Sequence, residues 1–317
     1  MSSAVTSPVE SLLKAELTRA DRALGGVAPV LGHLLAGPGH SLVSDAVVAR
    51  VRGMLNDLAR QFTARLKAQK GDNPASEIVR AESLAAQLAE DAPILAYLHA
   101  VATEALLTET LEQRAAIDPV LTPLSQELIA SEDPVMGEMA MQALAAQSRF
   151  IQGQRRMQQP ATELAPEPLE RALRIWARSA PVEQEPAIMQ AMRVLKSEYD
   201  EAQTRAGLLA RLVASLRGGV VAALELEHAG FALFASALAH STGQDRERAV
   251  LACHAHQAAR LVLSLRAAGL DTEAVERQFV TLEPAHTVPR SLNDLSFESA
   301  RAMLDDSALR PDLERLR

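Results

Sequence analysis

The stretch AIMQAMRVLKSEYDEAQTRAGLLARLVASLR, residues 187–217, decides the fold. Its apolar side chains recur in alternating steps of four and three residues, which is the spacing of one face of an α-helix. The seam consists of Ile188, Met192, Leu195, Tyr199, Ala202, Ala206, Leu209, Val213 and Leu216. Its small residues favour a helical bundle over a two-stranded coiled coil. The pattern predicts one long helix that ends at Gly218-Gly219.

The composition of the whole chain extends this interpretation to the remaining residues. Hydrophobic residues make up 48% of the 317 residues, but aromatic residues only 3%. Strands are usually rich in β-branched and aromatic residues, whereas Ala, Leu, Glu, Gln and Arg lose little on entering a helix. The sequence therefore predicts an all-α fold of stacked antiparallel helix pairs, either a HEAT-like array or a helical bundle.

Pairs of a polar residue and a proline mark the expected helix starts between residues 74 and 217. A polar side chain accepts from free amides of the first turn, and proline at the first helical position loses no donor that the helix needs. Asp91-Ala92-Pro93 is a looser version of the pattern. The pairs are Asn73-Pro74, Asp118-Pro119, Asp133-Pro134, Glu167-Pro168 and Glu185-Pro186. They predict roughly six helices joined by short links.

Glycine pairs and a change of pattern suggest how the chain is organised. Before residue 73 we expect helices over 8–24, 27–36 and 42–70, separated by Gly25-Gly26 and Gly37-Pro38-Gly39. Residues 71–74 are the candidate domain boundary. The expected parts are an N-terminal three-helix element (1–72), a helical-repeat region (73–217) and a C-terminal helical region with an irregular tail (218–317).

Charge and the single cysteine narrow the classes of partner and the cellular compartment. The net charge is −8, and residues 74–187 hold 8 basic but 17 acidic residues. An acidic chain with few aromatic residues is a poor nucleic-acid binder, because neutralisation of phosphate drives that affinity. Cys253 cannot form an intrachain disulfide, which suggests a reducing compartment. We expect a cytoplasmic protein without a nucleic-acid partner.

The N-terminus and the most apolar stretch of the sequence both argue against a membrane location. The N-terminus MSSAVTSPVESLLK lacks the basic segment and uninterrupted apolar run of a signal peptide. Residues 220–240 are long enough to cross a bilayer, but Glu225, Glu227 and His228 near their middle make insertion costly. We therefore expect no membrane partner.

Two longer stretches carry a resemblance to a known family. They are LTPLSQELIASEDP…AMQALAAQSRFIQGQRRM (121–157) and LLARLVASLRGG…FALFASALAHSTGQDRERAV…LVLSLRAAGL (208–270). This pattern resembles a bacterial family of helical domains of unknown function, over about the last two-thirds of the chain. The resemblance implies a HEAT-like helical array. It implies no established activity, and therefore no catalytic residue or cofactor to carry over.

The stretch VVAALELEHAGFALFASALAH, residues 220–240, holds the most suggestive ionisable residues. Glu227 lies amid an apolar stripe, with Glu225 and His228 close by. A Glu-x-x-His helix motif supplies two ligands in di-iron bundles, but those sites need a second motif and two further carboxylates. The only other copy is Glu283-Pro284-Ala285-His286, and its proline argues against a helix.

We therefore expect no metal and no cofactor at this stretch. The expected role of Glu227 is contact with solvent or with an arginine across a helix interface, for which Arg211, Arg260 and Arg266 are candidates. A buried pair of that kind specifies packing more than it stabilises. An unpaired Glu227 that lines a pocket would instead indicate a ligand site.

Two other clusters have plain structural interpretations. Cys253-His254-Ala255-His256 lacks the spacing of a metal site, so we expect a small buried cysteine beside exposed histidines. Arg171, Arg174 and Arg178 share a helix face with Trp176 nearby, and Arg149, Arg155 and Arg156 form a second basic group. Pairing with the acidic middle of the chain is the first expectation for these arginines. An anionic partner is the alternative for the arginines. Trp176 is either an anchor in an interface with a partner or a core residue.

The functional prediction follows from the absence of recognisable catalytic motifs. The sequence contains no glycine-rich phosphate loop, nucleophile triad or calcium loop, so an enzyme is not expected. We predict a non-catalytic protein-interaction or regulatory scaffold module with an unknown protein partner. Residues 42–70 or 187–217 would associate with a second copy in a homodimer. The alternative is a helical bundle that binds a metal or a small apolar ligand around Glu225, Glu227 and His228.

Overall fold

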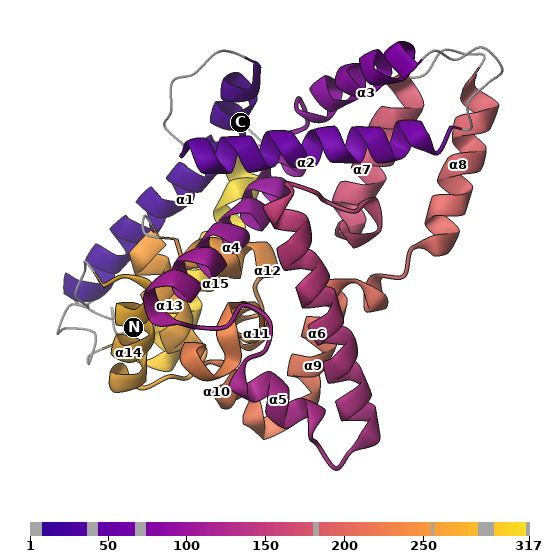
Figure 1. Ribbon diagram of the computed structural model, residues 1–317. Helices are drawn as coiled ribbons and strands as arrows, with labels where there is room; N and C mark the ends of the chain where they lie inside the picture. Colours follow the sequence, from indigo (N-terminus) through magenta and orange to yellow (C-terminus); the bar gives the residue numbers. More distant parts are fainter. Residues whose placement is uncertain are drawn as a thin grey trace. The chain divides into compact units, whose positions relative to one another are not determined.

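The structure of the protein is a computed structural model that describes residues 8–36, 44–66, 74–179, 184–254, 257–284 and 295–314. Over these residues the chain forms fifteen α-helices and three short 3-10 helices, with no β-strand (Figure 1). The predicted all-α fold is confirmed. None of the described helices is both long and apolar enough to cross a membrane.

The helices are numbered along the chain. They are α1 (Pro8–Ala36), α2 (Asp45–Ala64), α3 (Pro74–Leu88), α4 (Ala92–Ala115), α5 (Pro123–Ile129), α6 (Pro134–Arg155), α7 (Pro166–Ser179), α8 (Glu185–Glu198), α9 (Arg205–Ser215), α10 (Val220–Ala223), α11 (Leu226–Thr242), α12 (Arg246–Ala252), α13 (Ala258–Ala267), α14 (Thr272–Leu282) and α15 (Phe297–Glu314). The 3-10 helices are η1 (Ala161–Glu163), η3 (Glu201–Gln203) and η4 (Arg217–Gly219).

Backbone packing divides the chain into two compact units, each assembled from separate stretches of sequence. Unit 1 comprises Met1–Gly26, Leu107–Ser131 and Leu212–Arg317, and unit 2 comprises Val27–Leu106 and Glu132–Arg211. The expected segments 1–72, 73–217 and 218–317 do not correspond to these units, because the chain returns to each unit after leaving it. Of the boundary expected at residues 71–74, residues 71–73 lie outside the described part of the chain.

The core of unit 2 is built by helices that pack side by side. Helix α2 packs on α3, α3 on α7, and α7 on α8 (Figure 1). Trp176 of α7 is buried and stacks on Phe62 of α2, with ring centroids 5.1 Å apart. Aromatic side chains contribute large apolar areas to a core. Trp176 is therefore a core residue, and its alternative role as an exposed anchor for a partner is wrong.

The apolar stripe of α2 is also turned inward. The stripe residues Val47, Val51, Leu55, Leu58 and Phe62 are all buried. The helix ends at Ala64 and does not continue to residue 70 as expected, and residues 67–70 lie outside the described part. These five side chains are therefore part of the core of unit 2 and are not exposed on its surface.

The prediction of one helix over residues 187–217 is wrong. Helix α8 ends at Glu198 and α9 begins at Arg205. Between them Asp200 accepts a hydrogen bond from the Ala202 amide (3.0 Å), and the Thr204 hydroxyl accepts one from the Gly207 amide (3.1 Å). Such local side-chain bonds compete with the helix. The apolar period therefore continues across a break, and its members Ile188, Leu195 and Leu209 are buried within unit 2.

Most of the polar-proline pairs do mark helix starts. Asp133 caps α6, which begins at Pro134, and Glu185 begins α8. Asp118-Pro119 is the exception, because the Asp118 carboxylate accepts from the amides of Val120 and Leu121 and forms a turn. Helix α5 begins four residues later, at Pro123, behind the cap residue Thr122.

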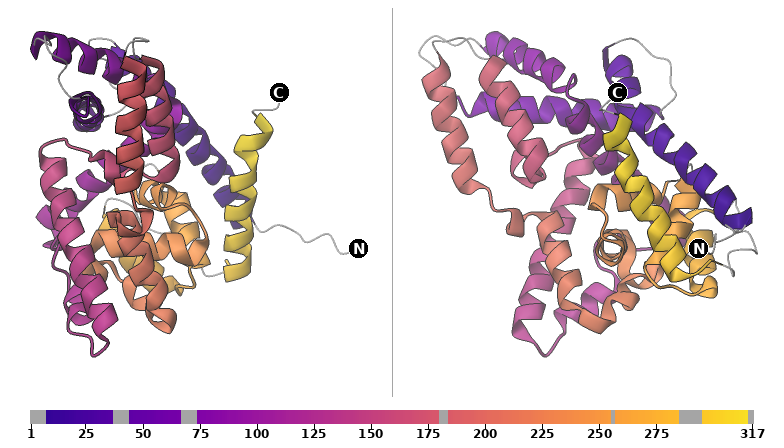
Figure 2. Two further views of the ribbon diagram at one scale, coloured as in Figure 1. Left: turned by 90° about the vertical axis from the view of Figure 1, so that its right-hand side faces the viewer. Right: turned by 180° about the vertical axis from the view of Figure 1, so that it is seen from behind.

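Unit 1 is organised around α11. This helix packs against α5, α10, α12 and α13. Helix α13 in turn packs on α14 and on α15, which is the yellow helix in Figure 2. Its hydrophobic residues, including Phe231, Phe234 and Leu238, are buried. Gly230 interrupts the helix with φ +70°, at a point where an added Cβ would overlap the methyl group of Thr122. Residues 220–240 are therefore two helices with a kink, and not the single helix that the sequence suggested.

Candidate functional site

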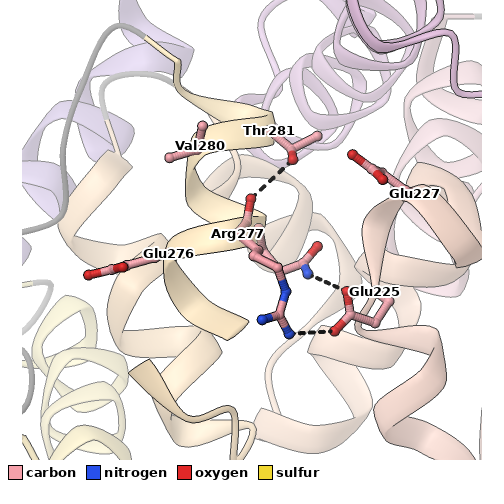
Figure 3. A pocket seen from close by; sticks show the side chains of 7 residues that line it. Glu225, Glu227, Glu276, Arg277, Val280 and Thr281 are labelled. Atoms are coloured by element: carbon pink, nitrogen blue, oxygen red, sulfur yellow. Dashed lines mark hydrogen bonds and ion pairs between the residues drawn. The ribbon is translucent and has the colours of Figure 1, made fainter. Parts of the chain in front are cut away.

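A surface pocket of about 420 Å³ lies in unit 1 between the start of α11 and one face of α14 (Figure 3). Its lining consists of Glu225, Glu227, Glu276, Arg277, Gln278, Val280 and Thr281. Two of the three residues that the sequence singled out, Glu225 and Glu227, therefore do line a pocket. The remaining lining residues come from α14.

Both ends of α14 are fixed by hydrogen bonds. At the start, the Asp271 carboxylate accepts from the Ala274 amide at 2.8 Å. At the end, the Arg114 guanidinium donates to the carbonyl oxygens of Thr281 and Leu282. Because the last carbonyls of a helix have no partner within it, this arginine supplies what the helix lacks. The pocket wall formed by α14 is thus held in place.

A buried glutamine joins α14 to the start of α11. The Gln278 side chain accepts from the Leu226 amide (2.8 Å) and donates to a carboxylate oxygen of Glu225 (2.7 Å). The first amides of a helix need an acceptor, and here a side chain 52 residues away provides it. Gln278 therefore fixes the mouth of the pocket by capping α11.

Glu225 is occupied by contacts within the protein. Its second carboxylate oxygen lies 3.4 Å from Nη2 of Arg277 (Figure 3). Nη1 of the same arginine lies 3.0 Å from Glu273. Gln278 donates to one oxygen and Arg277 contacts the other, so both oxygens of this carboxylate already have a partner within the protein. Glu225 and Arg277 form the wall of the pocket.

Glu227 and Glu276 differ from Glu225 in having no such contacts. Both side chains are exposed, and neither makes a hydrogen bond or ion pair with any residue in the described ranges. Figure 3 shows them on opposite sides of Arg277. Val280 stands on the same pocket with 52% of its surface exposed. The pocket thus offers two unpaired carboxylates and an apolar side chain.

Of the two roles expected for Glu227, contact with solvent is confirmed by its exposed side chain, and pairing with an arginine across a helix interface is wrong. Of the three candidates, Arg211 donates to the Ala202 carbonyl, Arg266 to the carbonyls of Leu270 and Leu295, and Arg260 contacts Asp21. The physical reason is the break between α10 and α11. It turns Glu227 out of the apolar stripe and onto the surface.

His228 lies outside the pocket lining and has a different neighbour. Its Nε2 is 3.3 Å from a carboxylate oxygen of Glu127 on α5. The structure therefore separates His228 from Glu225 and Glu227, which the sequence had grouped as one site. In the described ranges no three His, Cys, Asp or Glu side chains come together around a point where a metal could bind. His286 lies outside those ranges.

Cys253 is completely buried at the end of α12. Its thiol donates to the Ala249 carbonyl at 3.4 Å. Burial, together with the nearby charge of Glu283, raises the pKa of the Cys253 thiol well above its usual range. A thiol in this state is a poor nucleophile. Its neighbour His254 is half-buried, and His256 lies outside the described residues.

The arginines of α7 are mostly engaged on their own unit. Arg171 forms ion pairs with Glu167 (3.0 Å) and Asp91 (3.1 Å), and these carboxylates raise the pKa of Arg171. Arg174 donates to the carbonyl of Glu170 at 3.3 Å and is exposed, as is Arg178. Arg171 thus shows the intramolecular pairing that was the first expectation. Arg149, Arg155 and Arg156 are exposed as well.

Sequence reasoning missed a buried ion pair in unit 2. The guanidinium of Arg205 binds both carboxylate oxygens of Glu104, at 2.7 and 2.8 Å. It also donates to Gln147 (3.0 Å), and the Phe150 ring lies 3.7 Å from it. Both partners are buried, with exposed fractions of 7% and 1%. No sequence signal connects two residues that stand 101 positions apart.

The pocket residues of α14 were missed for the same reason. Glu276, Arg277 and Gln278 read as an ordinary charged helix, and only the fold brings them to residues 225–227.

Comparison with known proteins finds no matching family model, no matching curated sequence and no matching solved structure. The resemblance to a bacterial family of helical domains stays a prediction.

Proposed function

We propose that the protein is a non-catalytic interaction module whose pocket between α11 and α14 docks a lysine or arginine side chain of a partner protein. The observation that carries this proposal is the pair of unpaired carboxylates, Glu227 and Glu276, beside the exposed Val280. In this proposal both the protein and its partner are cytoplasmic. The proposal is compatible with membership of a bacterial family of HEAT-like helical domains.

The chemistry of the pocket suits a basic side chain. Lysine and arginine carry an apolar stem and a cationic head, so the stem would lie on Val280 while the head reaches the carboxylate of Glu227 or of Glu276. Both carboxylates are exposed and remain hydrated, so each contributes modestly to affinity. They contribute more to the rate and orientation of encounter, which depend on complementary charge.

The groups around the pocket support a binding role over a catalytic one. Glu225, Arg277 and Gln278 are engaged in holding α11 and α14 together. A catalytic acid or base must be held within hydrogen-bond reach of the reacting group by its surroundings. Glu227 and Glu276 are exposed, and no hydrogen bond from a described residue holds either side chain in place. The alternative of a metal or small apolar ligand gains no support, because the lining is charged and His228 lies elsewhere.

The test is site-specific photo-crosslinking in the native cell. A photoreactive amino acid is placed at Val280, and at Val135 of unit 2 as a control that is 70% exposed. The proposal predicts a discrete adduct from position 280 that is absent from position 135. The adduct should weaken in the Glu227→Gln/Glu276→Gln background and at higher salt. Equal adducts from both positions, or an adduct indifferent to the two carboxylates, would contradict it.

A further inference from the structure

Helix α1 is attached to unit 1 by a narrow face. Among residues 9–27, the side chains that are buried belong to Leu13, Leu17 and Ala20. Their spacing of four and three residues places them on one side of the helix. The other side chains in this range are exposed or half-buried, Leu12 among them. This first part of α1 therefore resembles an amphipathic helix that is docked by one face.

Polar contacts to α13 complete the attachment. Gln257, just before α13, donates to the Ala20 carbonyl at 3.0 Å, and the Arg260 guanidinium forms an ion pair with Asp21. Arg260 is 1% exposed, whereas Asp21 is 28% exposed. Asp21 is thus the carboxylate that compensates a buried cation, and it is supplied by the helix that lies on top.

The surface under α1 at Gln257 and Arg260, called the groove from here on, keeps polar atoms without hydrogen bonds even with α1 in place. The Nε of Arg260 and the Oε1 of Gln257 are buried and have no hydrogen-bond partner in the described part of the chain. Besides its ion pair with Asp21, Arg260 makes a long hydrogen bond, in which Nη1 lies 3.4 Å from the Gln244 amide oxygen. Buried polar groups without a partner destabilise the packing around them. Closure of α1 over this groove is therefore weakly favoured.

Two glycines weaken α1 where this attached part ends. Gly25 and Gly26 lie inside the helix and are exposed, and an added Cβ would meet no atom within 4 Å at either position. Packing therefore does not require glycine here. Glycine in a helix interior is less stable than alanine because the unfolded chain gains freedom. The pair forms a point at which the helix opens easily.

We propose that residues 8–24 of α1 detach at Gly25-Gly26, and that the groove over Gln257 and Arg260 then receives the same segment from a second copy of the chain. A second copy fits by identity, because its Leu13, Leu17 and Asp21 make the contacts that the first copy's residues made. Exchange of an identical element costs little more than opening the connection. The result is an α1-exchanged dimer.

This inference stands apart from the pocket at α11 and α14. Within one chain, α1 competes with its counterpart at the effective concentration set by the short connection. The exchanged dimer of the natural chain therefore grows with protein concentration. It also provides a route to self-association that does not use the stripes of residues 42–70 or 187–217.

A reciprocal charge exchange tests the proposal. One full-length chain carries Asp21→Arg and another carries Arg260→Asp, so that each alone places like charges together at the groove. In an equal mixture, exchange of α1 restores an opposite pair at both grooves. A chain carrying both substitutions restores the pair within itself and serves as the control for folding.

Light scattering coupled to size exclusion gives the readout. Each single variant and the doubly substituted chain should elute at the 34.0 kDa mass of one chain. The mixture should shift to twice that mass, with both variants in the complex. A mixture that stays at the mass of one chain, while both variants keep Cys253 protected from thiol reagents, would overturn the proposal.

A peptide measurement keeps the proposal testable if one variant does not fold. The probe is a fluorescent peptide of residues 8–24, PVESLLKAELTRADRAL. It should bind the full-length Asp21→Arg chain, whose own α1 is repelled, many-fold more tightly than the natural chain. The same peptide carrying Asp21→Arg should lose this binding. Equal affinity of the two peptides for the Asp21→Arg chain would refute the groove.

Discussion

Among the described residues, unit 1 and unit 2 each bury one arginine, and the two guanidinium groups have different partners. Arg205 in unit 2 is held by both oxygens of Glu104, by Gln147 and by the face of Phe150. Arg260 in unit 1 is more deeply buried, yet its carboxylate comes from the partly exposed Asp21 on α1, and its Nε has no partner. Burial accordingly lowers the pKa of Arg260 to about 10.

This difference distinguishes a cation that is built into a core from one that is covered by a removable part. Removing Glu104 strands the charge of Arg205, because every neighbour belongs to the body of unit 2. Removing Asp21 leaves another outcome open, because α1 can lift off and let water reach Arg260. The cost of losing Asp21 is therefore limited by the free energy with which α1 is docked.

The chain offers one natural reporter for each unit. Its single tryptophan, Trp176, lies in the core of unit 2, and its single cysteine, Cys253, is buried in unit 1. Tryptophan fluorescence follows the unfolding of unit 2 in urea. The rate at which a thiol reagent modifies Cys253 follows the opening of unit 1. The two readouts allow each arginine to be tested in its own surroundings.

The largest effect is expected for Glu104→Ala. Loss of one partner of a buried ion pair costs on the order of 3–5 kcal/mol in the free energy of unfolding, because a charge is left without compensation. The Trp176 transition should move to markedly lower urea. Replacing both partners by apolar residues, Glu104→Leu with Arg205→Met, should recover most of the loss. A double variant as unstable as Glu104→Ala would show that the pair itself stabilises the unit.

Gly230→Ala tests whether the backbone of α11, in the core of unit 1, tolerates less change than the backbone of α1. Alanine there must adopt φ +70° and overlap the methyl group of Thr122, so we expect a loss of about 2–3 kcal/mol. Cys253 should become reactive at lower urea. Gly25→Ala is the matched control, since that helical site is open, and it should stabilise the chain by up to about 1 kcal/mol. Equal effects at the two glycines would contradict the contrast between α11 and α1.

Asp21→Ala should have a smaller and more local effect. Because α1 detaches and lets water reach Arg260, the free energy of unfolding of unit 1 should fall by no more than about 1 kcal/mol. It is measured from the urea concentration at which Cys253 becomes reactive. Proteolysis of the chain between residues 14 and 22, where lysine and arginine offer trypsin sites, should become much faster. A loss as large as that of Glu104→Ala would remove the distinction between the two arginines.

The smallest effect is expected at Asp57, a half-buried anion of unit 2. Burial raises the pKa of Asp57, against the hydrogen bonds from the Gln159 amide and from Gln61. A carboxyl group with a raised pKa in the folded state stabilises it at low pH and loses that contribution as the pH rises. Asp57→Asn should therefore stabilise unit 2 slightly at pH 7, by well under about 1 kcal/mol.

The pH dependence provides the check on Asp57. The difference between the natural chain and Asp57→Asn should shrink as the pH falls through the raised pKa of the folded state toward the ordinary aspartate pKa of 3.8, and should be gone below 3.8, where both side chains are neutral. The measurement is the Trp176 urea midpoint across that range. A variant that is less stable at pH 7 would mean that the ionised carboxylate is needed by the Gln159 amide.

The sequence predicted the helical class and many helix starts because those depend on local chemistry. Composition favours helices over strands, and pairs such as Asp133-Pro134 satisfy the first amides of a helix whatever surrounds it. The apolar period of residues 187–217 was misleading because periodicity reports which face is buried, and not whether the backbone is continuous. Asp200 and Thr204 held the signal for the break, as side chains that cap backbone amides.

The sites were only partly predictable. Glu225 and Glu227 stood out as ionisable groups in an apolar stretch, and they do line a pocket. Gln278 and Arg277, which complete its wall, lie about fifty residues further along and show no signal of their own. The same holds for Glu104 with Arg205 and for Asp21 with Arg260. Long-range pairing of polar residues is set by how helices pack, which periodicity does not specify.

Hydrogen exchange of the natural full-length chain, read by mass spectrometry, tests the detachable α1 most directly. The account predicts that amides of residues 9–24 exchange many-fold faster than those of α13, through a local opening that urea barely changes. The amides of α9 around Arg205 should show no such local opening. If residues 9–24 exchange only together with α13, at the rate of global unfolding, α1 is a fixed part of unit 1 and the account is wrong.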